Sequence, residues 1–272
     1  MDLIIEAGRT ERNYWRDLWR YRELFYFLAW RDILVRYKQT VIGVAWALVR
    51  PLVTMVVFTL IFSRVAKLPA PGATPYPLLV FAALLPWQFF STALSEASNS
   101  LVTNANLISK VYFPRLVVPA GSVIISFVDF LITLGLMAVL MLYFRFAPDW
   151  RVLALPLFIV LTMGAALGVG LWLCALNVKY RDFRHIVPFI VQFGLYVSPV
   201  GFSSSVIPAK WRLIYSLNPM VGIIEGFRWS LLGGRMPLDW FAVMLSGGLV
   251  AILLATGIWY FRKTERSFAD VI

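Results

Sequence analysis

The sequence predicts an all-α integral membrane protein, because its composition, its apolar run lengths and its charge placement agree. The 272 residues are 60% hydrophobic and only 14% charged, with a mean hydropathy of +0.78. A soluble globular domain carries about 25% charged residues. The apolar residues also gather in runs close to the roughly 20 residues that a helix needs to cross a bilayer. We therefore expect one multi-pass membrane domain.

Six apolar segments are the predicted transmembrane helices. Residues 1–40 are then an N-terminal cytoplasmic interfacial segment, and residues 41–272 form the six-span transmembrane domain. Proline occurs in the second and fifth segments and makes their edges the least defined. The six segments are 41–63, 76–94, 116–144, 152–178, 186–202 and 240–261.

Basic residues predict the orientation of these spans. Of the 25 Lys and Arg residues, 16 fall on the side that holds both chain ends and 8 on the other. Cytoplasmic loops carry the excess of Lys and Arg, so both termini are expected in the cytoplasm. The first 40 residues are too charged for a secretory signal peptide.

The net charge of +11 does not indicate nucleic-acid binding. Basic residues that flank spans set topology and contact anionic lipid headgroups, and membrane lipids are the expected partners. Cys174 is the only cysteine and His185 the only histidine, so neither is expected to be catalytic or to hold a metal. The sequence also lacks the Gly-x-x-x-x-Gly-Lys-Ser/Thr phosphate-binding loop, and we expect this chain to bind no cofactor.

The segment between Arg9 and Leu28 predicts an amphipathic interfacial helix. Arginines occupy one face, and Trp15 and Trp19 suit headgroup depth. Such a helix is either a plain anchor or a collar around a cytoplasmic entrance. The apolar stripe consists of Tyr14, Leu18, Tyr21, Phe25 and Leu28.

The first span carries two features that a lipid-facing helix would avoid. Residues 31–40 are basic and run into the span without a turn residue, and Arg50 and Pro51 follow inside the apolar run. A charge is costly at that depth, and proline removes a backbone hydrogen bond. This span is expected to face protein or water.

The longest predicted cytoplasmic loop, residues 97–115, is polar at first and apolar towards its end. It either docks a cytoplasmic partner or folds back onto the bilayer. The candidate contact residues are Leu107, Ile108, Ser109, Lys110, Val111, Tyr112, Phe113 and Arg115.

Residues 203–235 predict two short amphipathic helices that are broken at Asn218 and Pro219 and lie on the outer side. Re-entrant helices of this kind form either a gate or a cap that merely packs. The candidate gate residues are Pro199, Trp211, Asn218, Pro219, Glu225 and Arg228.

Aromatic residues away from the span ends are candidates for lining a water-filled channel. Phe189, Phe193 and Tyr196 repeat at four and three residues and share one helix face. Helix packing or lipid contact is the alternative for each of them. The first span adds Trp46, Phe58 and Phe62.

Several of these segments together resemble the permease subunits of the ABC-type exporters of polysaccharides and polyol phosphates, namely those of O-antigen, capsule and teichoic acid. The similarity follows the same order and spacing across nearly the whole chain. It rests on residues 31–40, 43–46, 50–52, 107–115, 177–182, 198–200, 217–220 and 224–228.

The resemblance implies an inner-membrane homodimer of six-span subunits around a central channel, driven by two copies of a separate ATPase that binds ATP and Mg. It implies that residues 97–115 carry the coupling helix and residues 203–235 the periplasmic gate. The substrate would be a lipid-linked glycan such as O-antigen, with capsular polysaccharide or teichoic acid as the alternatives.

Two other classes of membrane protein fit the sequence less well. A secondary transporter would need intramembrane carboxylates, for which Asp129 is the candidate, and usually two similar halves, which the sequence lacks. A membrane-embedded transferase would need a cluster of acids and histidines at the interface, and the acids here are scattered.

Overall fold

The computed structural model describes residues 14–38, 41–68, 74–110, 113–180, 182–233, 236, 238–265 and 268. These residues form helices and connecting turns, which confirms the all-α prediction. The α-helices are α1 (Tyr14–Arg20), α2 (Arg22–Lys38), α3 (Val41–Thr59), α4 (Tyr76–Thr103), α5 (Ala105–Lys110), α6 (Val117–Tyr143), α7 (Leu155–Lys179), α8 (Phe183–Val197), α9 (Ala209–Ser216), α10 (Pro219–Leu232) and α11 (Trp240–Thr264). A π-helical segment, η1 (Leu60–Val65), extends α3, and two 3₁₀ turns are η3 (Trp150–Ala154) and η4 (Ser204–Val206).

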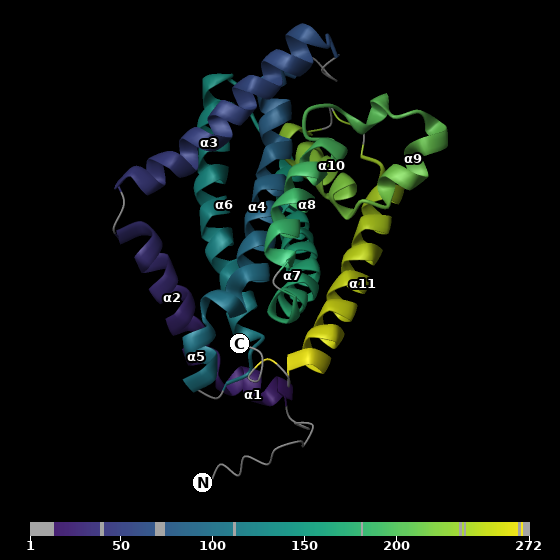
Figure 1. The fold of residues 1–272 in the computed structure, drawn as a ribbon. Helices are drawn as coiled ribbons and strands as arrows, with labels where there is room; N and C mark the ends of the chain where they lie inside the picture. Colours follow the sequence, from purple (N-terminus) through teal and green to yellow (C-terminus); the bar gives the residue numbers. More distant parts are fainter. Residues whose placement is uncertain are drawn as a thin grey trace.

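Helix α4 is the centre of the bundle. It packs against α6, α7, α8 and α10, while α11 covers the far side of α7 (Figure 1). Within the most apolar part of each span, 78% of the residues are buried in α4 but only 11% in the first span. The first span therefore has little protein cover in a single subunit.

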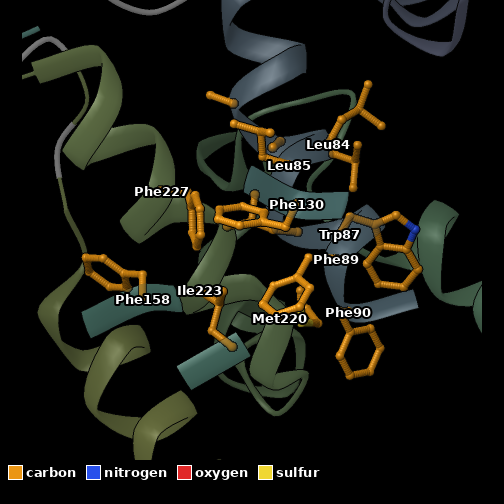
Figure 2. Packing of buried hydrophobic residues seen from close by; sticks show 14 of the residues in the cluster. Leu84, Leu85, Trp87, Phe89, Phe90, Phe130, Phe158, Met220, Ile223 and Phe227 are labelled. Carbon is orange, nitrogen blue, oxygen red and sulfur yellow. The ribbon is translucent and has the colours of Figure 1, made fainter. Parts of the chain in front are cut away.

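Aromatic rings fill the core between α4, α6, α7 and α10 (Figure 2). The Phe130 ring lies 5.1 Å from that of Phe89 and 6.0 Å from that of Phe227, which in turn contacts Phe158. Edge-to-face and tilted arrangements of this kind are the favoured geometries of ring pairs. The contacts hold α10 deep in the bundle, although it is not one of the long spans.

Close backbone approach joins α7 to α11. A Cβ added to Gly257 would lie 2.4 Å from the carbonyl oxygen of Gly168, so neither position has room for a larger residue. Small residues at such contacts are typical of helix packing in membranes, where close van der Waals contact provides the attraction.

Five helical segments among the described residues are long and apolar enough to cross a membrane, namely 48–65, 76–103, 117–143, 150–179 and 240–264. The predicted fifth span, 186–202, differs: α8 has 15 residues and ends at Val197. Ser198 is extended because the proline that follows disfavours the helical conformation. A helix of this length measures about 22 Å and falls short of a bilayer core of about 30 Å.

The predicted 97–115 loop is also partly helical. Helix α4 continues to Thr103, nine residues beyond the expected end, and α5 occupies residues 105–110. Ala97, Ser98 and Leu101 are buried, because this last part of α4 packs on α7. Tertiary contacts thus hold a polar stretch in a helix.

Helices α2 and α3 run along one side of the bundle, with α3 oblique to the other spans (Figure 1). The apolar stripe of the N-terminal segment is confirmed as a shared face: Tyr14 and Leu28 are buried, and Phe25 packs beside them. Trp19 points outward and is exposed. Two arginines of the predicted basic face, Arg9 and Arg12, lie outside the described residues, as does the side chain of Trp15. Helices α1 and α5 and the last turn of α11 gather at one end of the bundle, here called the α1 end (Figure 1).

Candidate functional site

The aromatic face predicted on the fifth apolar segment lies on α8 and is open. Phe189, Phe193 and Tyr196 are 68%, 59% and 64% exposed. The first two rings stack with centroids 6.1 Å apart and planes inclined by 11°. On the other side of α8, Val187 is buried and Gly194 lies against the indole of Trp87. These contacts fix α8 to α4 and leave a ladder of rings without protein cover in the subunit.

The aromatic residues of the first span point inward instead. Phe58 and Phe62 pack against the main core, and Phe62 lies 6.2 Å from the ring of Phe202. Within the subunit, they serve as packing residues. The side chain of the third candidate, Trp46, lies outside the described residues.

Arg50 and Pro51 occupy opposite environments on α3. Pro51 is buried, whereas Arg50 is exposed. The exposed part of α3 is otherwise apolar, with Val53, Val56 and Val57 open to the surroundings. An exposed guanidinium inside an apolar helix favours a protein or water neighbour over lipid.

The candidate coupling segment is only partly open. Lys110 is exposed and Leu107 half-buried, but Ile108 and Phe113 are 6% and 4% exposed. The expectation that Ile108 and Phe113 present themselves to a partner is therefore wrong for this structure, because both belong to the core at the α1 end. Val111, Tyr112 and the side chain of Ser109 lie outside the described residues.

Long-range contacts at the α1 end hold the last candidate of this segment, Arg115. Its backbone N–H donates to Oε1 of Glu265 at 2.9 Å, and its guanidinium donates to the backbone carbonyl of Glu265 and lies over the ring of Phe268. Arg262 lies 4.4 Å above the ring of Tyr14. Burial, followed by the nearby Glu265 carboxylate, raises the pKa of Tyr14 well above its ordinary value, so the phenol stays neutral. Helix α1, the end of the coupling segment and the end of α11 are thus joined.

A charged cluster links α2 to the bundle. Asp129, near the middle of α6, pairs with Arg36 at 3.0 Å and accepts a hydrogen bond from Tyr37. Arg36 also lies 3.7 Å from Glu96 on α4. The carboxylate at Asp129, the candidate ion site of a secondary transporter, is therefore engaged in an ion pair.

Four of the predicted gate residues, Pro199, Asn218, Pro219 and Arg228, lie at or contact the turn after α8 and the start of α10. Asn218 caps α10 by accepting a hydrogen bond from the N–H of Met220 at 3.0 Å, and its amide donates to Ser198 at 3.0 Å. Pro219 follows as the first residue of α10, a position that proline favours. Pro199 is buried beside this contact.

Arg228 is the most buried charged residue of this region, with 1% exposed. Its guanidinium donates to the carbonyl oxygens of Leu79 at 3.1 Å, Phe202 at 2.8 Å and Val200 at 2.9 Å. These bonds join α10, α4 and the turn after α8. Glu225 lies one turn earlier on α10 and is half-buried. Trp211 on α9 takes no part in these hydrogen bonds: its ring is exposed, and the Lys210 ammonium lies over it.

The sequence did not indicate a role for Asn177, which belongs to residues 177–182, one of the segments that resemble the exporter permeases. The buried Asn177 amide donates to the carbonyl oxygen of Ser98 and to Oδ1 of Asn99, at 3.1 Å and 3.0 Å. It ties the end of α7 to the unexpected extension of α4. Among the described residues, no group of three His, Cys, Asp or Glu side chains is placed to hold a metal ion.

Comparison with known proteins agrees with this architecture. Residues 23–232 match the family described as ABC-2 type transporter. The chain belongs to this family. A protein of Myxococcus xanthus described as "O-antigen export system permease protein RfbA" is 29% identical over 259 residues, which cover 94% of this chain and 98% of the relative. Two Klebsiella pneumoniae proteins with the same description are 27% and 26% identical, each over 89% of this chain and 92% of the relative. This ABC-2 transporter chain is thus a multi-pass membrane protein similar in extent to its relatives.

Proposed function

We propose that this ABC-2 chain is the transmembrane subunit of an ATP-driven exporter that moves lipid-linked O-antigen across the bacterial inner membrane. The observation that carries the proposal is the match to O-antigen export permeases over nearly the full length of both chains. Both termini, and with them the α1 end, are cytoplasmic in this proposal. The chain is not itself an enzyme: ATP and Mg are bound by a separate ATPase subunit.

The poorly covered first span supports a homodimer. Its exposed valines and the exposed Arg50 lie on a helix with few contacts in one subunit. A second copy with the same surface would bury the valines and enclose the charge, as closed two-fold interfaces do. Two subunits with two ATPases make the transporting unit.

The open ring ladder on α8 supports a glycan path. Sugar rings present apolar C–H faces, which stack on aromatic rings without fixed hydrogen-bond register. A long polymer that binds weakly at many points can keep moving, whereas tight sites would stall it. Phe189, Phe193 and Tyr196 are therefore the strongest candidates to contact the polymer.

The α1 end supports attachment of the ATPase. On α5, Lys110 is exposed and Leu107 is partly buried, and the buried Ile108 and Phe113 attach the coupling segment to the core at the α1 end. The exposed positions are then the partner contacts, and the buried ones fix their position. At the opposite end of the bundle, the hydrogen bonds of Asn218 and Arg228 would keep the outer side closed at rest.

Complementation of export-deficient bacteria tests the proposal. The chain and its ATPase are expressed in a strain that lacks its own O-antigen export genes, and surface O-antigen is measured by gel and antibody. We expect export to return only when both subunits are present. Parallel strains that lack capsule or teichoic-acid export show which polymer class is carried, and rescue of either of those strains alone would refute the O-antigen assignment.

Purification provides a second test of the proposed function. The chain alone is expected to hydrolyse no ATP, and the co-expressed complex to contain two copies of each subunit. Robust ATP hydrolysis by this polypeptide without a partner would contradict the assignment of ATP hydrolysis to a separate subunit.

A further inference from the structure

One side of α4 carries a continuous polar face between residues 88 and 103. Every position in this stretch that is not buried carries a polar side chain, except Val102. At 100° per residue, the polar positions fall within an arc of about 140°. This polar stripe consists of Gln88, Ser91, Thr92, Ser95, Glu96, Asn99 and Thr103.

The position of the stripe conflicts with lipid contact. It begins at the α5 end of α4 and extends over sixteen residues, a rise of about 22 Å along a helix that spans the membrane. Partly exposed hydroxyl, amide and carboxylate groups are costly in hydrocarbon. The stripe must therefore face water, protein or a polar ligand.

The hydrogen bonds of the stripe leave acceptors on its open side. The hydroxyls of Ser91, Ser95 and Thr103 donate to carbonyl oxygens one turn earlier on α4, at 3.0, 2.8 and 3.1 Å. With their protons engaged, these oxygens keep lone pairs for an incoming donor. The Glu96 carboxylate, half-exposed and 3.7 Å from the Arg36 guanidinium, adds a charged acceptor. A ligand rich in hydroxyl groups supplies the matching donors.

The surroundings of the stripe define its end. Towards the other end of α4 the exposed polar positions stop, and Leu84, Leu85 and Trp87 are buried. At that level α8 contacts α4, because Gly194 lies against the indole of Trp87. The stripe is open from the α1 end to about the middle of α4 and is closed there by apolar packing.

We propose that the polar stripe is the track along which the hydroxyl-rich glycan enters the membrane domain from the cytoplasmic side. This inference rests on the proposed function and deepens it. The stripe holds the polymer through weak hydrogen bonds in the inner half of the path. The ring ladder of α8 supplies stacking contacts.

A second copy of the chain is the competing occupant. Ser91 and Ser95 are spaced four residues apart, as small residues are in membrane helix pairs. The interfaces of homodimers are more apolar than the rest of the protein surface. The exposed valines of the first span offer such a surface, whereas the stripe is polar, so we assign the self-contact to the first span and the stripe to the glycan.

Thiol accessibility tests the inference in the assembled complex with its ATPase. Cys174 is first replaced by alanine, and single cysteines are introduced at Ser95 and Asn99, with Ala93 and Ala97 on the buried side of α4 as matched controls. A charged thiol reagent is applied to the cytoplasmic face of inverted vesicles. We expect the two stripe cysteines to react many-fold faster than the controls. Vesicles from cells that make the lipid-linked glycan should protect them, relative to vesicles from cells that do not.

Export measurements supply the second readout. The double variant Ser91→Ala and Ser95→Ala, which keeps the size of the helix face, should lower surface glycan several-fold at unchanged complex assembly. Ser95→Trp should block export while ATP hydrolysis continues. The proposal that the stripe contacts the glycan would be overturned by any of three results. These are no thiol reaction at the stripe, disulfide cross-linking of Ser95→Cys between subunits, and normal export by both variants. Failure of the unmodified chain to export any glycan would instead overturn the proposed function.

Discussion

Replacing Arg228 tests how much of the fold depends on a single buried guanidinium. Methionine keeps most of the side-chain volume but removes three hydrogen bonds to the carbonyl oxygens of Leu79, Val200 and Phe202. Each bond to a charged donor contributes about 1.5–3 kcal/mol, and the bonds are not additive. We expect Arg228→Met to lower the free energy of unfolding by about 4 kcal/mol, since the carbonyls stay buried without a partner.

Unfolding in mixed detergent and dodecyl sulfate micelles, followed by tryptophan fluorescence, measures this change. Arg212→Ala is the matched control, because Arg212 is exposed on α9, and it should alter stability by no more than about 0.5 kcal/mol. If Arg228→Met is as stable as Arg212→Ala, the three hydrogen bonds do not hold α10, α4 and the turn after α8 together.

Two further substitutions separate packing from substrate contact. Phe113→Ala should cost about 3–5 kcal/mol of stability, because the ring is buried at the α1 end, and Lys110→Ala should not; equal melting curves for both variants would show that the ring is not part of the core. Alanine at Phe189, Phe193 and Tyr196 together should shorten or reduce surface glycan while ATP hydrolysis and stability persist, since these rings are open. Unchanged glycan in that triple variant would remove the ring ladder from the transport path.

The membrane class and most of the spans were predictable because they depend on local composition. Long apolar runs can bury their backbone only as helices in a bilayer, so helices α3, α6, α7 and α11 follow from the sequence with small shifts at the ends. The shared face of Phe189 and Tyr196 follows equally from helical periodicity. Such patterns involve neighbours a few residues apart.

The extension of α4 to Thr103 was not predictable in the same way. Its polar residues are typical of a loop, and the helix persists because Asn177 and the buried face of α7 contact it. The burial of Phe113 likewise depends on the core at the α1 end, which includes Phe268 from the other end of the chain. An aromatic residue in a predicted loop carries no local signal that tells a docking contact from a buried one.

The role of Asp129 likewise depended on a contact between distant parts of the chain. Tyr37 and Asp129 are 92 residues apart in the sequence, yet they share a hydrogen bond. From the sequence alone, a carboxylate inside a span indicates an ion site, because an isolated charge is costly there. The ion pair with Arg36 removes that cost and with it the argument for ion coupling.

The contacts of Glu265 at the α1 end have a mechanical consequence. They join the last residue of the coupling segment, Arg115, to the end of α11, a helix of 25 residues that runs as a straight rod (Figure 1). At its far end the same rod packs against α10, where a Cβ on Gly222 would lie 2.6 Å from the carbonyl oxygen of Ala242. In the proposed transporter, a push or pull by the ATPase on this segment would either move α11 along its axis or break the Glu265 contacts. Movement of α11 would then reach α10, which Arg228 bonds to α4 at the opposite end of the bundle.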